Sequence, residues 1–288
     1  MHGKFLINLM RRVDPNVYTT EYYLTDCTGY KEFKESLGEE LEPRFSEIIK
    51  YLRITPGMRV LDIGCGRGEM VLYAAKRGAK AIGIDYATEA IKLAKLVLMK
   101  QKKEIAKNMQ FLIMDAKKLK FSSNSFDLII MTDVVEHLYP EELDNVFNEC
   151  KRVLKPGGKM VIHTAPNRLF NDIGYRYYSY IVGRMVVSLW NVILKKTYAH
   201  IARPEVLRTD SHHIMHINEP SYFSLKRLFK KHNFEGRIVS SNITAKKPEI
   251  SFKDTFFNAV VYFHPISKNF PLNVLWGSDF VSVITNKK

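Results

Sequence analysis

The 288-residue sequence has few cysteines, few acidic residues for its basic content, and no repeat or low-complexity segment. Its three cysteines include no Cys-x-x-Cys pair, so they form a poor disulfide framework and favour a reducing compartment. The start, MHGKFLINLMRRV, places Arg11 and Arg12 after a short apolar patch, whereas a secretory signal begins with its basic residues. We therefore expect a cytoplasmic protein.

The shortage of acidic residues leaves a strong positive charge. Lys and Arg number 44 against 30 Asp and Glu, which gives a formal net charge of +14. Such a charge favours anionic partners: nucleic acid, phosphorylated small molecules or an acidic membrane surface. The composition, 46% hydrophobic and 26% charged, is that of a folded protein. Charge alone does not choose among these partners.

The middle of the chain alternates between strand and helix patterns, which predicts a parallel sheet covered by helices on both faces. Strands are expected at 59–63, 79–84, 109–114, 126–131 and 159–164, and helices at 69–77, 88–107 and 141–154. The stretch Lys155-Pro156-Gly157-Gly158 is expected to end the last of these helices and turn the chain into the fifth strand.

The rest of the chain consists of regions before and after this alternating core. We expect an N-terminal helical extension (1–55) with a helix at 41–52 over the sheet or its open end, the cofactor-binding core (56–167), and a substrate-covering insertion (168–218). The last part (219–288) completes the core. It has a predicted helix at 219–232 with Pro220 in its first turn, strands at 236–243 and 279–284, and an irregular aromatic-rich segment at 252–276.

A glycine-rich turn follows the first predicted strand in VLDIGCGRG. Glycines let a backbone approach a ligand closely, and Asp85, at the end of the next strand, can accept hydrogen bonds from ribose hydroxyls. Asp62 stands two residues before the first glycine, where it would repel a pyrophosphate and attract an amine or a sulfonium. Asp115 ends the third strand and can accept from an adenine amino group. The pattern predicts a nucleotide-like ligand with a positive group.

These segments together resemble the class I S-adenosylmethionine-dependent methyltransferases. The resemblance rests on VLDIGCGRG, GIDYA, MDAKKL, FDLIIMTDVVEHL and VLKPGGKMVIHTAPN, covers roughly residues 45–167, and extends more weakly to the final helix and strands. It implies a Rossmann-like α/β fold with a seven-stranded sheet, mostly parallel, whose last strand (279–284) is antiparallel. It also implies S-adenosyl-L-methionine as cofactor and S-adenosyl-L-homocysteine as product.

The resemblance also implies which residues contact the cofactor. Asp62 would line its methionine part, Asp85 its ribose and Asp115 its adenine, while Thr132 and Asp133 would border the sulfur and methyl group. Each acid by itself could instead cap a helix or sit in a surface turn; the ordered set favours a cofactor site. The full predicted set is Asp62, Gly64, Cys65, Gly66, Gly68, Asp85, Tyr86, Asp115, Ala116, Thr132 and Asp133.

Two polar residues just beyond the fourth strand are candidates for the acceptor side. Methyl transfer is an in-line displacement that relies on alignment, and a base is needed only if the acceptor enters protonated. At the rim where ligands bind in open α/β sheets, Glu136 can orient the acceptor and His137 can accept a proton. The structural alternative is that Glu136 caps the following helix and His137 packs beside the fifth strand.

Other histidines are further candidates. His163, near the end of the fifth strand, is either a satisfied core histidine or a rim residue. His212, His213 and His216 form H-H-x-x-H, which is ordinary loop, a substrate-facing cluster with a base, or a metal site on His213 and His216. Because no further ligand completes such a site in sequence, we predict no metal. The catalytic candidates are Glu136, His137, His163 and His213.

The segment 172–196 predicts a helix with a narrow polar stripe and a wide apolar face. Arg176 and Arg184 interrupt it, which argues against a membrane span. The apolar face is either a lid or dimer contact, or it lies at a membrane surface with basic residues reaching lipid phosphates, namely Lys195, Lys196 and Arg203. The aromatic segment 252–276 can extend the same acceptor-side wall.

These observations predict an S-adenosylmethionine-dependent methyltransferase (EC 2.1.1), most simply an O-methyltransferase. Its acceptor would be a small molecule, glycan or lipid-linked compound that is anionic or membrane-associated, with the protein at the inner face of a membrane or as a homodimer. An RNA methyltransferase fits the charge but lacks an RNA-binding appendage and an N-P-P-Y-type motif. A regulatory protein without catalysis would not need Asp62, Asp85, Asp115 and Asp133 together.

Overall fold

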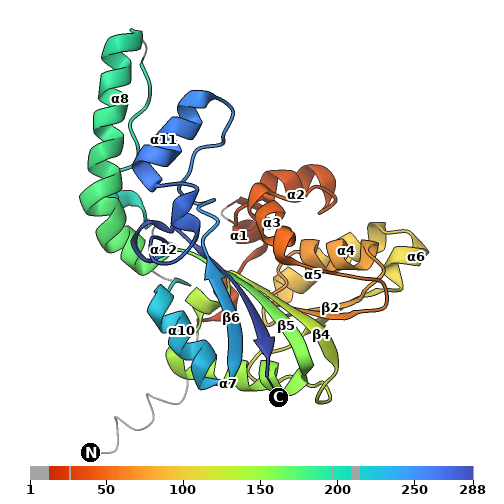
Figure 1. Cartoon of the computed structure of the whole chain (residues 1–288). Coiled ribbons are helices and arrows are strands. Elements are labelled where there is room, and N and C mark those ends of the chain that lie inside the picture. The colour runs from red at the N-terminus through yellow and green to blue at the C-terminus, as the bar shows by residue number, and fades with distance from the viewer. Residues whose placement is uncertain (1–12, 26, 196, 209–214, 288) are drawn as a thin grey trace, which may run out of the picture.

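A seven-stranded sheet forms the centre of the computed structural model, which describes residues 13–25, 27–195, 197–208 and 215–287 (Figure 1). The strand order is β3-β2-β1-β4-β5-β7-β6, and only β7 runs antiparallel to its neighbours. The strands are β1 (Arg59–Ile63), β2 (Lys80–Asp85), β3 (Met109–Ile113), β4 (Phe126–Thr132), β5 (Leu154–Thr164), β6 (Phe234–Val239) and β7 (Phe280–Asn286). The predicted fold class is confirmed.

Helices cover both faces of the sheet because its central strands are apolar on both sides. Ile130 of β4 packs in the cluster with α4 (Glu69–Lys76) and α5 (Thr88–Lys100). Its neighbours Ile129 and Met131 face the other way, toward α7 (Pro140–Val153) and α10 (Tyr222–Lys231). All three side chains are fully buried, which explains the unbroken apolar run that predicted this strand.

Two predicted boundaries in the core are wrong. The helix expected at 88–107 is split into α5 and α6 (Lys103–Ala106), because Gln101 leaves the helical conformation; its side-chain amide donates to Glu39 Oε1 at 3.0 Å. Lys155-Pro156-Gly157-Gly158 does not precede the fifth strand but forms an irregularity within it. Leu154 already pairs with Phe126, and the ladder resumes where Lys159 pairs with Leu128.

Two predictions near the C-terminus are also corrected. The helix expected from residue 219 begins as α10 at Tyr222, because Ser221 caps it by accepting a hydrogen bond from the Ser224 amide. Pro220 therefore lies before the helix. The segment expected to be irregular holds α11 (Phe252–Tyr262), a 3₁₀ turn η7 (Ile266–Lys268) and α12 (Asn273–Trp276), and Ser251 caps α11.

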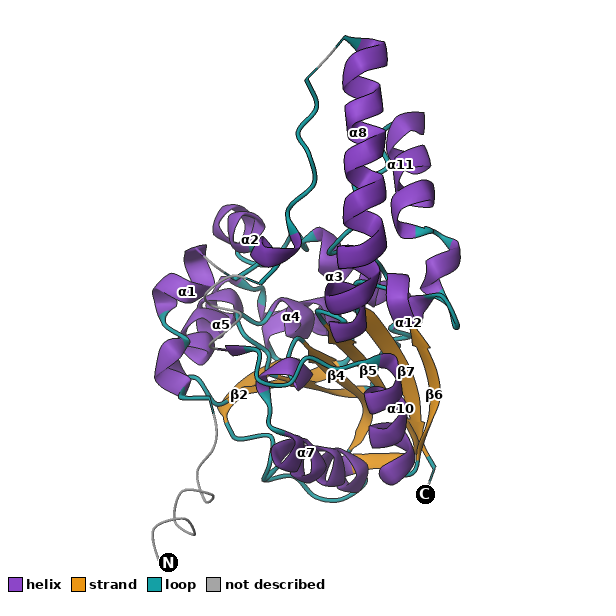
Figure 2. Ribbon diagram, turned by 90° about the vertical axis from the view of Figure 1, so that its left-hand side faces the viewer, coloured by secondary structure: helices purple, strands orange, loops and turns teal. Residues whose placement is uncertain are grey.

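The N-terminal extension folds as η2 (Pro15–Val17), α1 (Thr20–Thr25), α2 (Tyr30–Ser36), α3 (Pro43–Ile48) and η3 (Ile49–Tyr51). The helix expected at 41–52 thus begins two residues later, at a proline in its first turn, and ends as a 3₁₀ turn. Phe33 and Phe45 bury these short helices against the α4 and α5 side of the core. The extension thereby lies on the side of the molecule that holds α4 and α5, as Figure 2 shows.

The insertion after β5 forms a helical projection away from the sheet (Figures 1 and 2). A π-helical segment η5 (Phe170–Ser179) leads into α8 (Tyr180–Leu194), so the single helix expected at 172–196 is two joined segments. Beyond it the chain returns through η6 (Pro204–Val206), and α11 packs along α8. We call α8 and α11 together the helical projection. Among the described residues, no helix has both the length and the apolar character needed to cross a membrane.

Candidate active site

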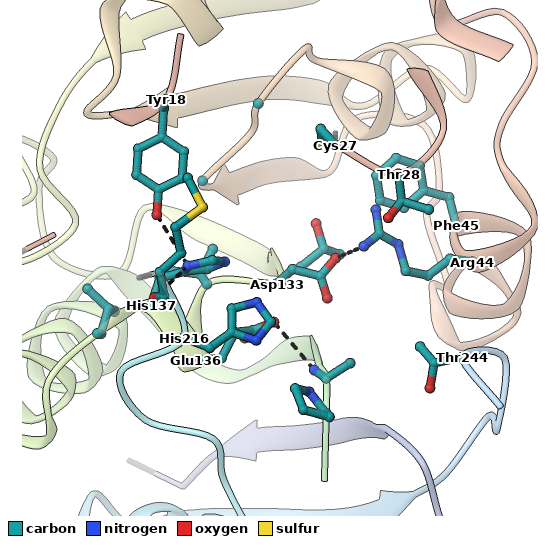
Figure 3. A pocket seen from close by; sticks show the side chains of 18 of the residues that line it. Tyr18, Cys27, Thr28, Arg44, Phe45, Asp133, Glu136, His137, His216 and Thr244 are labelled. Atoms are coloured by element: carbon teal, nitrogen blue, oxygen red, sulfur yellow. Dashed lines mark hydrogen bonds and ion pairs between the residues drawn. The ribbon is translucent and has the colours of Figure 1, made fainter. Parts of the chain in front are cut away.

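A cavity of about 990 Å³ opens at the carboxyl ends of β1, β2, β4 and β5. Its walls come from the glycine loop after β1, the residues that follow β2 and β4, the N-terminal helices, and the base of the helical projection. Figure 3 shows the part where Tyr18 and Arg44 of the N-terminal region face Asp133 beyond β4. This is the edge where strand order reverses, since β1 has β2 on one side and β4 on the other. Ligands of open α/β sheets bind at this place.

Two buried carboxylates define one half of the cavity. Asp85 accepts hydrogen bonds from the amides of Gly66, at 3.0 Å, and Ala87, at 2.9 Å, and burial raises its pKa to about 6. Asp62 is 2% exposed, and its Oδ1 has no hydrogen-bond partner among the described residues. Burial, followed by the nearby Glu69 and Asp85 carboxyl groups, raises the pKa of Asp62. A buried oxygen without a partner is costly, so this position fits a ligand that brings a donor or a positive group.

The glycine loop leaves space beside these acids. Gly64 and Gly66 have left-handed backbones, with φ of +68° and +50°. A side chain at Gly64 would collide with Val134, whereas one at Gly66 would point into the cavity near Tyr23. Gly68 differs from the prediction: it precedes α4 away from the cavity wall and packs against Phe111. All other predicted cofactor residues line the cavity: Asp62, Gly64, Cys65, Gly66, Asp85, Tyr86, Asp115, Ala116, Thr132 and Asp133.

The N-terminal extension contributes side chains that the sequence analysis did not single out. Tyr18, Tyr22 and Tyr23 line the cavity, and the Tyr18 ring centroid is 5.7 Å from that of Tyr86. Arg44 lies between Glu42 and Asp133 and forms an ion pair with each. The three closely spaced tyrosines of the N-terminal extension were the available signal. Nothing local to Arg44 points to Asp133.

Asp133 lines the cavity and belongs to a chain of charges that runs from there into the protein interior. Its Oδ1 is 2.6 Å from His163 Nδ1, and His163 Nε2 is 3.2 Å from Asp279 Oδ2. Burial opposes charge on the His163 ring and on the Asp133 carboxylate, but the ion pairs outweigh it: the pKa of Asp133 is lowered, and that of His163 is raised to about 10. His163 is fully buried and does not line the cavity. It was predicted as a catalytic candidate, yet its place is that of a positioning residue.

Glu136 follows Asp133 on the 3₁₀ turn η4 (Val135–His137) and lines the cavity although it is only 1% exposed. Its Oε2 accepts a hydrogen bond of 2.8 Å from the Thr164 hydroxyl. Burial, followed by the neighbouring Asp133 carboxylate, raises the pKa of Glu136 to about 8. The carboxyl group therefore holds a proton more readily than an exposed glutamate, and in its protonated form it can donate a hydrogen bond into the cavity. The alternative in which Glu136 caps the next helix is wrong, because Glu142 reaches back to the Tyr139 amide at the start of α7.

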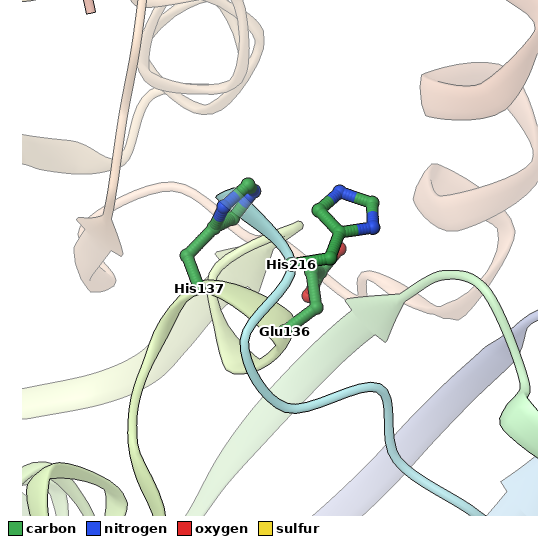
Figure 4. Close-up of side chains that lie close together, drawn as sticks. All are labelled: Glu136, His137 and His216. Carbon is green, nitrogen blue, oxygen red and sulfur yellow. The ribbon is translucent and has the colours of Figure 1, made fainter. Parts of the chain in front are cut away.

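His137 and His216 bring two imidazole rings to the same wall, as Figure 4 shows. Their ring centroids are 4.9 Å apart. His137 Nδ1 lies 3.0 Å from the carbonyl oxygen of Met215 and 3.2 Å from the Tyr18 hydroxyl. Since a carbonyl only accepts, the contact with Met215 places the proton on Nδ1 and makes Nε2 the basic nitrogen of the neutral ring. His212 and His213, including the predicted catalytic His213, lie outside the described residues.

Glu136, His137 and His216 also have the chemistry of a metal site. One side-chain ligand atom from each lies within 4.8 Å of the others. A carboxylate with two imidazoles suits a divalent transition metal. The H-H-x-x-H pattern thus contributes His216 to the site, but its neighbours there are Glu136 and His137, which the sequence separates from it by about eighty residues.

Comparisons with known proteins agree with this site. Residues 61–162 match the family of methyltransferase domains. The ubiquinone biosynthesis O-methyltransferase of Chelativorans sp. (strain BNC1) is 31% identical over 52% of this chain and 55% of its own length. The cyclopropane-fatty-acyl-phospholipid synthase of Escherichia coli (strain K12) is 30% identical over 48% of this chain and 34% of its own. This chain therefore spans about half of the first enzyme and a third of the second.

The fold has matches among solved structures. A putative S-adenosylmethionine-dependent methyltransferase from Listeria monocytogenes superposes with a TM-score of 0.52 at 14% identity, covering 85% of this chain and 98% of its own. Such a likeness supports the fold, while the matched domain and the sequence relatives support the family. Residues 61–162 therefore form a methyltransferase domain, and the sheet around them has the fold of the class I S-adenosylmethionine-dependent methyltransferases. Its cofactor is S-adenosyl-L-methionine, as the buried, unpartnered Asp62 oxygen and the open Gly66 position allow.

Proposed function

We propose that this methyltransferase acts on a hydroxyl oxygen of an apolar small-molecule or lipid-linked acceptor, with Glu136 and His137 on the acceptor side. The observation that carries the proposal is their convergence: both line the cavity that holds Asp62 and Asp85, next to the carboxyl end of β4. The cofactor, when bound, supplies an electrophilic methyl group on a sulfonium. In-line displacement then requires a positioned oxygen that loses its proton.

Three residues of the cavity wall have separate roles in this transfer. Neutral Glu136 donates a hydrogen bond that orients the acceptor oxygen, and His137 accepts the hydroxyl proton at Nε2. The Met215 carbonyl and the Tyr18 hydroxyl hold the His137 ring from the other side. Asp133, held by Arg44 and His163, stays ionised at the same wall and stabilises positive charge near the sulfonium. The cavity encloses these groups and limits access of water.

The far half of the cavity supports an apolar acceptor. Its walls carry Phe170, Tyr175, Ile201, Leu207 and Tyr262 at the base of the helical projection. Such a lining binds aliphatic or aromatic surface, and the polar side chains of Asn171, Thr244 and Lys247 line the cavity as well. Two relatives, the ubiquinone biosynthesis O-methyltransferase and the cyclopropane-fatty-acyl-phospholipid synthase, carry names that refer to apolar or lipid substrates. Both are consistent with an apolar acceptor here.

Transfer of a labelled methyl group tests the proposal. The purified protein is incubated with methyl-labelled cofactor and a cell extract fractionated into lipids, polar small molecules, glycans, RNA and protein. We expect label in the lipid or apolar small-molecule fraction, in a base-stable ether rather than an ester or amine. The Asp85→Ala variant, which should bind cofactor poorly, serves as the blank. Label confined to RNA, or a product methylated only on carbon or nitrogen, would overturn the proposal.

A further inference from the structure

The helix α8 has a wide apolar face, and a large part of this face points away from the protein. Ser179 and Gly183 face inward: the Ser179 hydroxyl donates to the Val261 carbonyl at 2.8 Å, and Gly183 packs against Ile201 and Val261. The outward side carries a stripe at four-residue spacing, Ile181, Met185, Leu189 and Ile193, together with Val192. The expectation of an apolar face packed as a lid is wrong for these residues, because small residues turn the opposite side toward α11.

The exposure is greatest at the far end of the helical projection. Val192 is 76% exposed and Ile193 63%. The N-terminus of the antiparallel α11 lies beside them, since Trp190 contacts Phe256 and Phe257, and it adds Phe252 at 84% exposure. An exposed apolar stripe of this length is normally covered by another protein surface or by lipid. Nothing among the described residues covers this end.

The charges near the far end of the helical projection and the length of α8 indicate which kind of surface covers this end. The basic residues Arg184, Lys195, Arg203 and Lys253 are exposed on or next to the helical projection, in a chain of net charge +14. An interface between two copies related by a two-fold axis would bring these like charges together. An anionic bilayer instead accepts apolar side chains below its headgroups and pairs basic side chains with its phosphates. At 15 residues, α8 is about 22 Å long, which suits a bilayer surface and not a crossing.

We propose that the far end of the helical projection inserts into the surface of an anionic phospholipid bilayer. The inserted groups are Leu189, Val192, Ile193 and Phe252, and Lys195 and Lys253 contact the lipid phosphates. The base of the same projection lines the cavity through Tyr175, Ile201 and Tyr262. Docking therefore places the acceptor side of the cavity toward the membrane. The docking itself does not rest on the proposed function, because it needs neither cofactor nor acceptor.

Vesicle sedimentation of the full chain, without methyl donor, tests the docking. The vesicles are phosphatidylcholine alone or phosphatidylcholine with about one third phosphatidylglycerol. We expect partition into the anionic vesicles that weakens with added salt, and little partition into the neutral ones. Val192→Asp and Phe252→Asp should each lower the anionic partition coefficient by about tenfold or more, since a charge replaces an inserted apolar group. Matched controls are Met99→Asp and Phe223→Asp, which change apolar residues of 72% and 53% exposure on α5 and α10.

Every outcome decides for or against the docking. Loss of binding in the projection variants alone supports it. Equal binding to both vesicle types, or equal loss in projection and control variants, overturns it. So does absence of vesicle binding together with a concentration-dependent dimer that Val192→Asp dissociates, because the stripe then joins two copies. If vesicles bind as expected but no apolar product is methylated, the proposed function fails and the docking stands. Cofactor binding by each variant confirms that it is folded.

Discussion

The His163 ring lies between the carboxylates of Asp133 and Asp279, with its Nδ1 at 2.6 Å from the first and its Nε2 at 3.2 Å from the second. Both carboxylates only accept, so both ring nitrogens donate and the buried ring is an imidazolium. Arg44 completes the chain by pairing with Asp133. These four residues come from α3, β5 and the segments that follow β4 and precede β7, and their charges connect the N-terminal extension to the sheet.

His163 should make the folded protein less stable at alkaline pH. Its pKa is raised to about 10 in the folded state, above the value of about 6.5 for an unperturbed histidine. The stabilisation is therefore fully present below about pH 6.5 and is lost as pH rises through about 10, with a slope of up to about 1.4 kcal/mol per pH unit. Urea denaturation from pH 6 to 10 should show this decline. His163→Gln should remove it; an unchanged pH slope in that variant would show that the ring is neutral when folded.

Arg44→Met should be destabilising. It removes one partner of the part-buried Asp133 carboxylate, and the cost should lie between the roughly 1 kcal/mol of an exposed ion pair and the roughly 3–5 kcal/mol of a fully buried one. The free energy of unfolding from chemical denaturation measures the loss. Lys155→Met is the matched control, because it breaks the more exposed pair with Asp127 and should cost about 1 kcal/mol or less. Equal losses in the two variants would mean that Asp133 does not depend on Arg44.

The two acceptor-side residues should respond differently to substitution. His137→Ala removes the proposed base and should lower kcat by about a hundredfold or more, with little change in the Kd of the cofactor. Glu136→Gln keeps a hydrogen-bond donor and should lower kcat by less than about tenfold at pH 7.

The pH dependence of kcat/KM tests the ionisation of Glu136. In the wild type, kcat/KM should fall above about pH 8 as Glu136 ionises, and this limb should vanish in the Glu136→Gln variant. A wild-type rate that rises through pH 8 and a flat profile in the variant would instead make Glu136 the base.

Asp85→Ala should mainly weaken cofactor binding. The Asp85 carboxylate lies against the glycine loop and accepts a hydrogen bond from the Gly66 amide. The substitution removes this charged hydrogen-bond acceptor from the cofactor site. We expect the Kd measured by calorimetry to rise by about tenfold to a hundredfold. Asp127→Ala, an acid at the opposite end of β4, should leave the Kd unchanged. A similar rise in both variants would indicate general loss of structure.

Added Zn²⁺ should inhibit the enzyme. A metal bound by Glu136, His137 and His216 would take the Nε2 lone pair that the proposed base needs. His216→Ala should raise the Zn²⁺ concentration needed for half-inhibition, while the rate without metal changes less than in His137→Ala. Activation by a divalent metal, lost in His216→Ala, would instead assign the three residues to a catalytic metal centre.

The parts of the fold that could be predicted from sequence are those with local causes. The apolar run of β4, the glycine turn after β1 and the capped helices around them are specified by neighbouring residues, so their boundaries were predicted to within a few positions. The errors at α5, β5 and α10 lie where a longer-range contact or a capping residue decides the end of an element. For α5 this contact is the one between Gln101 and Glu39.

The residues of the candidate site also fall into two groups: those set by a local motif and those that depend on contacts between distant segments. Asp62, Gly66 and Asp85 belong to an ordered motif within one strand–helix–strand unit, and their approach to one cavity follows from the parallel sheet. His216 and Arg44 come from segments far away in sequence. The role of His163 depended on Asp279, which lies more than a hundred residues beyond it.

By itself, the sequence determined the sheet, its cofactor edge and the presence of a wide apolar face on the segment after β5, because each arises from the order of neighbouring residues. Only the tertiary structure decided that Glu136, His137 and His216 meet, that His163 is enclosed by two carboxylates, and which side of α8 faces outward. Burial and the pairing of charges set these outcomes, and both depend on which distant segments pack together.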